Sequence, residues 1–249
     1  MNIRLAHKII IALDVKHGQD ALTLVDRLED AEIFKVGLEL FTAEGPSLFE
    51  DLKSRQKHLF LDLKLHDIPN TVAGAVASGV RHGIHMMTLH AAGGREMMAR
   101  ARETAQKTAQ ESGLSRPLLL GVTILTSLKD NHLAEIGMEA DTETQVLRLA
   151  RLAFEAGMDG VVCSPWEIAL IKEECGKDFL VVAPGIRPAW AAAQDQKRIM
   201  TPAQAMDRGA DYIVIGRPVT QASSPSEALT RIIEELEESK ARPHGKESA

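Results

Sequence analysis

The chain has 249 residues, of which 45% are hydrophobic and 26% charged, and its net charge is −6. This composition is typical of a soluble globular protein, and a negative balance without a basic run argues against a nucleic-acid partner. The sequence has no apolar stretch of the ~18 residues that would span a bilayer. Because no Pro/Gly/Ser-rich linker divides it, we expect one domain over residues 1–238 and a charged, disordered tail over 239–249.

The cysteines and the first residues both favour a cytoplasmic protein. Only two cysteines occur, Cys163 and Cys175, which fits reduced thiols in a chain too large to need disulfides. Cys163 closes a predicted strand, where a buried, inert thiol is the expected state. Residues 1–8 lead directly into a strand and lack the long apolar region of a secretory signal.

Apolar runs rich in β-branched residues alternate along the chain with segments of helical period. Strands are predicted over residues 9–13, 33–36, 58–61, 86–89, 118–122, 160–163, 179–182 and 212–215. Helices are predicted over 19–30, 43–55, 71–82, 95–111, 143–156, 165–174, 202–208 and 226–238. Eight such alternations suit a closed (β/α)8 barrel, although an open, doubly wound sheet has the same local pattern.

Polar residues favour the barrel, because they follow or close almost every predicted strand. In a barrel the carboxyl ends of all strands surround one mouth, whereas an open sheet gathers its chemistry at one switch point. We therefore predict an α/β protein with a single (β/α)8 TIM barrel. The residues on which this rests are Asp14, Lys35, Asp62 with Lys64, His90, Thr126, Arg187 and Arg217.

Segment 60–70, FLDLKLHDIPN, places two acids and a lysine in a run that otherwise alternates like a core strand. Side chains two apart share a face of a strand, so Asp62 and Lys64 should point the same way. Burying unpaired charge is unfavourable, which indicates a functional pocket at the end of the strand. A purely structural ion pair is the alternative.

Asp14 and Lys35 should join this pair at the mouth, with Asp67 just beyond it. Neighbours of opposite sign favour one another's ionised forms. A carboxylate held there would repel a substrate carboxylate, while an ammonium would stabilise the carbanion left after decarboxylation and deliver a proton to it.

Two late segments have the character of an anion site. Gly185 and Arg187 follow the seventh predicted strand, and Gly216 and Arg217 follow the eighth, where barrels frequently bind phosphate. Ordinary turn glycines with solvated arginines are the alternative. The connection 188–201 is long enough to form a lid that carries Gln196 to the ligand, although its alanine-rich stretch equally suits a short helix.

Seven segments together make a specific pattern. They are Ala12-Leu13-Asp14, Phe34-Lys35-Val36-Gly37, the run from Asp62 to Thr71, Leu125-Thr126-Ser127, Pro184-Gly185-Ile186-Arg187-Pro188, Asp195-Gln196 before Thr201-Pro202, and Ile215-Gly216-Arg217-Pro218. From about Ile9 to Val219 the chain thereby resembles the bacterial form of the orotidine 5′-phosphate decarboxylase family.

The resemblance implies conversion of orotidine 5′-monophosphate to uridine 5′-monophosphate and carbon dioxide in pyrimidine nucleotide synthesis, without a metal or organic cofactor. It implies that Lys64 donates a proton to C6 and that Asp62 lies against the departing carboxylate. Asp14 and Lys35 would bind the ribose hydroxyls.

The resemblance also implies contacts with the rest of the nucleotide. Thr126 would contact the pyrimidine, with Ser127 as a nearby alternative. The family is a homodimer, so Asp67 and Thr71 would enter the partner's pocket. The phosphate would be held by Gln196, Gly216, Arg217 and Arg187.

Related barrels offer other readings. Sugar-phosphate decarboxylases and hexulose-phosphate synthases hold magnesium with a glutamate where Lys35 stands, and pentulose-phosphate epimerases use a histidine and aspartate metal site. Here only His66 and His90 lie near strand ends, and a hydrogen-bonding role is favoured for both. A Schiff-base role for Lys64 needs a neutral amine, which the flanking acids oppose. A non-catalytic nucleotide-binding barrel would not need Lys64 at all.

Overall fold

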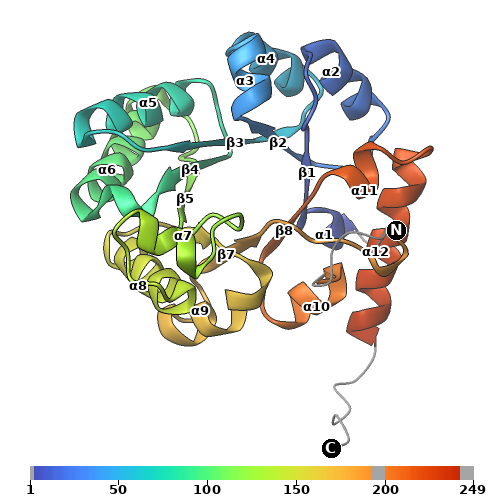
Figure 1. Ribbon diagram of the computed structural model, residues 1–249. Coiled ribbons are helices and arrows are strands. Elements are labelled where there is room, and N and C mark those ends of the chain that lie inside the picture. Colours follow the sequence, from blue (N-terminus) through green and yellow to red (C-terminus); the bar gives the residue numbers. More distant parts are fainter. Residues whose placement is uncertain (1–2, 192–199, 242–249) are drawn as a thin grey trace, which may run out of the picture.

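The computed structural model describes residues 3–191 and 200–241. Eight parallel strands form one closed barrel in chain order, and β8 returns to pair with β1 (Figure 1). This closure confirms the predicted TIM barrel and excludes the open sheet. The strands are β1 (Ile9–Ala12), β2 (Ile33–Gly37), β3 (His58–Leu65), β4 (Met86–His90), β5 (Leu118–Val122), β6 (Gly160–Val162), β7 (Leu180–Ala183) and β8 (Tyr212–Ile215).

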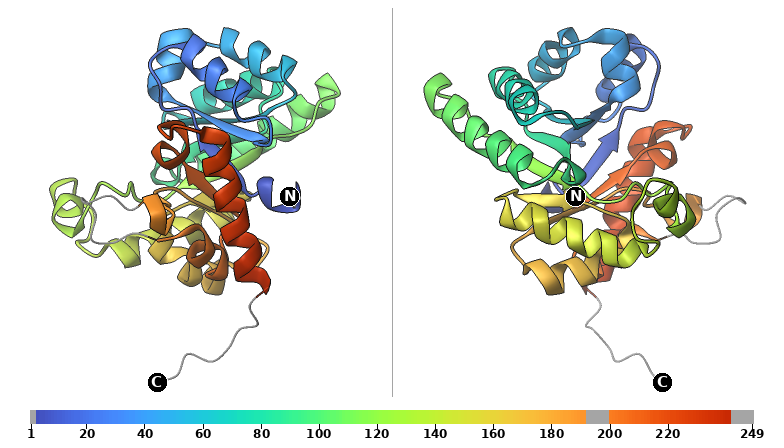
Figure 2. Two further views of the ribbon diagram at one scale, coloured as in Figure 1. Left: turned by 90° about the vertical axis from the view of Figure 1, so that its right-hand side faces the viewer. Right: turned by 60° about the vertical axis from the view of Figure 1, so that its left-hand side comes forward.

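Helices surround the barrel on the outside, and α12 runs along it with α1 at its side (Figure 2). No helix within the described ranges is long and apolar enough to cross a membrane. The helices are α1 (Ile3–Ala6), α2 (Gly18–Asp26), α3 (Leu38–Glu44), α4 (Ser47–Ser54), α5 (Pro69–Arg81), α6 (Arg95–Ser112), α7 (Asp130–Glu135), α8 (Thr142–Glu155), α9 (Ile168–Cys175), α10 (Pro202–Asp207), α11 (Arg217–Thr220) and α12 (Pro225–Ala241), with 3-10 turns η1 (Ala91–Gly93), η2 (Pro165–Glu167) and η3 (Ala189–Ala191).

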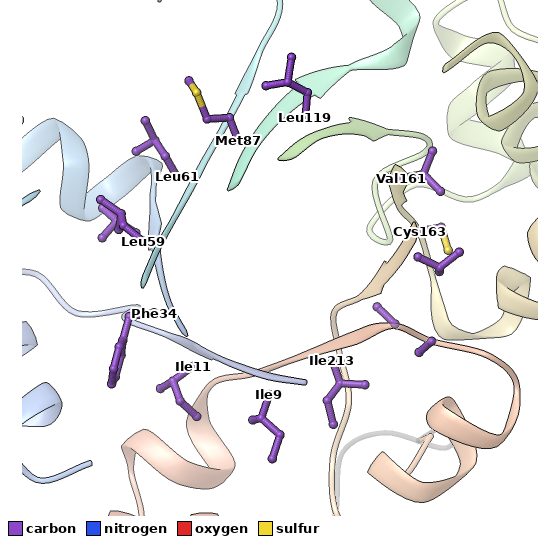
Figure 3. Close-up of a cluster of buried hydrophobic side chains, with 14 of the residues drawn as sticks. Ile9, Ile11, Phe34, Leu59, Leu61, Met87, Leu119, Val161, Cys163 and Ile213 are labelled. Carbon is purple, nitrogen blue, oxygen red and sulfur yellow. The ribbon is translucent and has the colours of Figure 1, made fainter. Parts of the chain in front are cut away.

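Side chains of each strand alternate between two buried apolar layers. The outer layer, which includes Ile9 and Ile11, packs between sheet and helices (Figure 3). A residue two positions after an inner-layer residue points to the same side of its strand, but one layer closer to the carboxyl end. Such residues therefore lie at the mouth of the barrel. The inner layer consists of Ile10, Ala12, Ile33, Phe60, Met86, Leu120, Val182 and Val214.

The prediction of one helix over 43–55 is wrong, because the structure has two helices, α3 and α4, in this region. The first, α3, begins directly after β2 and ends at Glu44, and the next residue, Gly45, has a φ of +65° that suits glycine. Pro46 follows and cannot continue the hydrogen bonding of a helix. The short helices α7 and α11 were also not predicted, since each has fewer than two turns of apolar pattern.

The last helix is longer than predicted. It continues to Ala241, three residues beyond the expected boundary at 238, and the Ser239 hydroxyl donates a hydrogen bond to the carboxylate of Asp207 at 3.2 Å. The remainder of the predicted disordered tail, residues 242–249, lies outside the described residues.

Candidate active site

A cavity of about 330 Å³ opens at the carboxyl ends of the strands. Two lysines and two arginines outnumber two aspartates among its charged residues, although the chain as a whole is negative. The cavity therefore suits a small molecule that carries several negative charges. Its charged lining residues are Asp14, Lys35, Asp62, Lys64, Arg187 and Arg217.

Acids and lysines form a continuous row on one side of the cavity. The Lys64 ammonium donates to both carboxylate oxygens of Asp62 at 3.0 Å. The Lys35 ammonium lies 3.6 Å from Asp62 Oδ2 and 3.2 Å from Asp14 Oδ1. The Asp62 side chain is 12% exposed and that of Asp14 is 61% exposed, so the row runs from the barrel floor to its rim.

The backbone of β3 changes conformation where it delivers Lys64 to the cavity. Lys64 has a φ of +52°, a left-handed value that costs a non-glycine residue about 1–2 kcal/mol. The pairing with β4 shifts here, because Leu61 faces Met87 but Leu65 faces Leu89. Three residues of β3 thus stand opposite one residue of β4, a bulge of the kind that redirects side chains near active sites.

Another ion pair of the barrel, between Arg116 and Asp159, has a purely structural environment. Arg116 donates two hydrogen bonds to Asp159 at 2.7 Å, and Asp159 also accepts from the Leu119 N–H. Neither residue of that pair lines the cavity. The hydrogen bonds of the Lys64 ammonium within the described residues both go to Asp62, which leaves donor capacity facing the cavity. This difference favours a functional role for the Asp62–Lys64 pair.

The glycine–arginine segments lie on the other side of the cavity. Gly185 has a φ of +76°, a conformation that favours glycine, and Arg187 follows it half-buried. The Arg187 N–H donates to the Met200 carbonyl at 3.1 Å, and Ile186 pairs with Met200, so both ends of the connecting loop are held together. Arg217 is exposed and opens α11 after Gly216.

Three titratable groups close to the mouth have altered proton affinities. Burial raises the pKa of the Cys163 thiol well above its usual value, and Glu167 adds to the effect, so this free cysteine stays a thiol. Burial also raises the pKa of Glu167 to about 7, although its carboxylate accepts from the Ser164 N–H. Burial lowers the pKa of His90, and the neighbouring His66 and Lys64 lower it further.

The model of the "Orotidine 5'-phosphate decarboxylase / HUMPS family" matches residues 7–232. The chain belongs to this family. Its resemblance to orotidine 5′-phosphate decarboxylases is confirmed, as is the prediction of a carboxy-lyase at the level of the family.

Curated relatives and solved structures agree with this assignment. The chain is 50% identical to an orotidine 5′-phosphate decarboxylase of Nostoc sp. over 92% of its own length and 97% of the relative's. It is 52% identical to one of Alkalilimnicola ehrlichii, with 92% and 96% covered. The crystal structure of the Lactobacillus acidophilus enzyme superposes with a TM-score of 0.82 at 39% identity, and covers 92% of this chain and 98% of its own.

Most site residues predicted from the family pattern meet at the cavity. The Thr126 side chain reaches it, whereas Ser127, its alternative, is not among the lining residues of the described part. Gln196 and the central part of the predicted lid lie outside the described residues. The 3-10 turn Ala189–Ala191 contains only the first residue of the alanine-rich stretch 191–193, so the rest of that stretch lies outside the described residues as well. The predicted residues that line the cavity are Asp14, Lys35, Asp62, Lys64, Thr126, Arg187, Gly216 and Arg217.

Asp67 and Thr71 do not line the cavity of their own chain as far as the structure describes it. Both are exposed at the start of α5, where the Asp67 carboxylate accepts from the Ile68 N–H at 2.6 Å. His66 and His90 lie with ring centroids 5.3 Å apart. Within residues 3–191 and 200–241, no group of three or more His, Cys, Asp or Glu side chains is arranged to hold a metal ion.

Sequence reasoning missed Thr88. This residue is fully buried in β4, and its hydroxyl lies between the Lys64 N–H and the Asp62 carboxylate. The available signal was its register: it stands two residues after Met86, on the inward face of the strand. Threonine is so common in strands that this position alone did not indicate a role.

Proposed function

We propose that this protein is a cytoplasmic enzyme that decarboxylates orotidine 5′-monophosphate to uridine 5′-monophosphate without a metal or organic cofactor. Membership of the family supports the reaction. The single observation that carries the proposal is the position of the Asp62 carboxylate, which faces the cavity between the ammonium groups of Lys64 and Lys35.

The positive side of the cavity binds the phosphate in this proposal. Arg187 and Arg217 supply permanent charge and forked donors that match phosphate oxygens, and Gly216 permits close approach of the backbone. Gln196 completes the phosphate contacts from the loop. A dianionic phosphate so far from the reacting carbon holds the substrate in place and orients it for the reaction.

The other end of the nucleotide meets the charged row. Asp14, at the exposed end of the row, and Lys35, which joins it to Asp62, bind the ribose hydroxyls. Thr126 contacts the pyrimidine ring. The C6 carboxylate then lies against Asp62, and the two like charges repel one another in a site that shields them from water.

Decarboxylation relieves that repulsion. The bond between C6 and the carboxylate carbon breaks, its electron pair remains on C6, and neutral carbon dioxide leaves. The Lys64 ammonium stabilises the developing negative charge and gives its proton to C6, which yields uridine 5′-monophosphate. The two hydrogen bonds to Asp62 hold this ammonium at the cavity.

We further propose that the active species is a homodimer in which Asp67 and Thr71 of each chain complete the partner's site. Two observations support this assembly. Both residues are exposed beside the mouth, and the apolar side chains of Ile68 and Leu38 at the same rim are 67% and 65% exposed. Large exposed apolar groups at a rim are typical of a surface that another chain covers.

The metal-dependent members of related barrels are disfavoured by Lys35. An ammonium cannot replace the glutamate that would bind magnesium, and it lies here in an ion pair with two aspartates. A Schiff-base mechanism is also disfavoured, because it requires a neutral amine and Lys64 forms an ion pair with Asp62.

The test is the loss of absorbance of orotidine 5′-monophosphate with the wild-type protein, Lys64→Ala and Lys107→Ala. Lys107 is an exposed lysine on α6 and serves as the matched control. We expect turnover by the wild type and the control, and a fall of at least about 10²–10⁴-fold for Lys64→Ala. Wild-type activity should persist with a chelator. A wild type that binds the nucleotide but does not turn it over would indicate a non-catalytic barrel, and activity abolished by the chelator would indicate a metal-dependent relative.

A further inference from the structure

Thr88 is buried at the one place where β3 and β4 lose their regular pairing. Asp62, Leu63 and Lys64 of β3 stand opposite Thr88 alone, between the pairs Leu61–Met87 and Leu65–Leu89. A bulge of this size leaves backbone groups without ladder partners. The Lys64 N–H is one of them, and it donates to Thr88 Oγ1 at 2.9 Å.

The same hydroxyl also reaches the charged row. Thr88 Oγ1 lies 3.0 Å from Asp62 Oδ1, and because a carboxylate only accepts, the hydroxyl must be the donor. A hydroxyl has one hydrogen, so its orientation is determined by these two contacts together. Asp62 Oδ1 in turn accepts from the Lys64 ammonium, which closes a ring of contacts that includes both the backbone and the side chain of Lys64.

We propose that Thr88 is a positioning residue for the reaction, and that its hydroxyl holds the bulged backbone of Lys64 and the carboxylate of Asp62 in the geometry that decarboxylation needs. Thr88 itself does not line the cavity described above. Its effect therefore passes through Asp62 and Lys64, and the inference rests on the proposed function.

The left-handed conformation of Lys64 explains why such a contact is needed. Within the described residues, only Gln56 and Lys64 combine a side chain with a positive φ. A residue in this region keeps its conformation only when its surroundings determine it. The Thr88 hydroxyl supplies that constraint from a different strand, and it does so on the inward side, where the Lys64 side chain enters the cavity.

The experiment compares Thr88→Val, which keeps the shape and removes the hydroxyl, with Thr88→Ser, which keeps the hydroxyl. We expect kcat of Thr88→Val to fall about 10–100-fold while KM changes less than about 3-fold, because misplaced reacting groups slow chemistry more than they weaken binding. Thr88→Ser should retain kcat within about 3-fold. Thr108→Val, at a buried threonine of α6 away from the mouth, is the matched control and should behave as wild type.

The conservative variant separates positioning from a general loss of structure. Thermal unfolding measures whether Thr88→Val is folded, and a hydroxyl that positions Asp62 and Lys64 predicts that Thr88→Ser restores kcat while KM stays nearly constant. Thr108→Val should match the wild type in both parameters. Should Thr88→Val not fold, Thr88→Cys, whose thiol is a poor donor and acceptor, takes its place with the same expectations.

The outcomes distinguish this inference from the function on which it rests. No turnover by the wild type would refute the proposed function and the inference together. Turnover by the wild type with an unchanged kcat in a folded Thr88→Val would refute the inference alone. An equal fall of kcat in Thr88→Val and Thr88→Ser would also refute it, because shape and not the hydroxyl would then be responsible.

Discussion

The ammonium of Lys35, on β2, lies 3.6 Å from the Asp62 carboxylate of the neighbouring strand β3. Both side chains are 12% exposed, so the contact lies well inside the mouth of the barrel. The Lys64 ammonium contacts the same carboxylate at 3.0 Å, so Asp62 has a lysine on each side. The Asp62 carboxylate thus lies at the point where, in the proposed reaction, the substrate carries its own negative charge.

Asp62→Asn tests the repulsion directly. We expect kcat to fall by about 100-fold or more while KM stays equal or decreases, because the asparagine no longer destabilises the bound carboxylate. Steady-state kinetics on orotidine 5′-monophosphate give both parameters. Asp51→Asn, at an exposed position of α4, is the control. A normal kcat in Asp62→Asn would remove the basis of the mechanism.

Mixed dimers test the shared site. Asp67→Ala and Lys64→Ala homodimers should both be inactive. After the two variants exchange subunits at random, half of the dimers are mixed and each has one intact site, so activity should recover to about a quarter of the wild-type value. The measurement is the decarboxylation rate before and after exchange. No recovery, with exchange verified by mass, would contradict the assignment of Asp67 to the partner's site.

Arg217→Ala tests the phosphate side. We expect KM to rise about 10–100-fold with a smaller effect on kcat, because a charge-assisted contact with the phosphate is made throughout the reaction. Inhibition by uridine 5′-monophosphate should weaken to a similar degree. Arg148→Ala removes an exposed arginine of α8 and controls for net charge. If neither Arg217→Ala nor Arg187→Ala alters KM, the anion is bound elsewhere.

The raised pKa of Glu167 predicts how the stability of the fold depends on pH. Its pKa is raised by burial from 4.5 to about 7 in the folded chain, so the folded state holds the proton more tightly than the unfolded state. The stabilising effect of that proton is present below about pH 4.5 and is lost as the pH rises through about 7. The charge of Glu143 also raises the pKa of Glu167, and Glu167 in turn raises the pKa of the buried Cys163.

Glu167→Gln should remove that part of the pH dependence. The amide oxygen can still accept from the Ser164 N–H, and no charge develops as the pH rises. Relative to wild type, we expect the variant to gain about 1–3 kcal/mol between pH 5 and pH 8. Urea unfolding at the two pH values measures the difference. Parallel curves for the two proteins would show that the carboxyl titrates at its ordinary value.

The sequence by itself determined the alternation of strands and helices, the Asp62–Lys64 pair and the two glycine–arginine segments. These features are local, because period-two alternation and turn chemistry depend on residues only a few positions apart. They predicted the barrel, and eight of the expected residues line one cavity at its mouth. Errors occurred where local signals were weak, as in the helix that Gly45 and Pro46 divide.

Only the tertiary structure decided closure and the support of the site. The pairing of β8 with β1 joins residues about 200 positions apart, and no local pattern specifies it. Thr88 meets Lys64 and Asp62 across 24 and 26 residues, through a bulge that changes the register between two strands. A register shift depends on how both strands pack in the closed sheet, so the role of a buried threonine becomes visible only when its neighbours are in place.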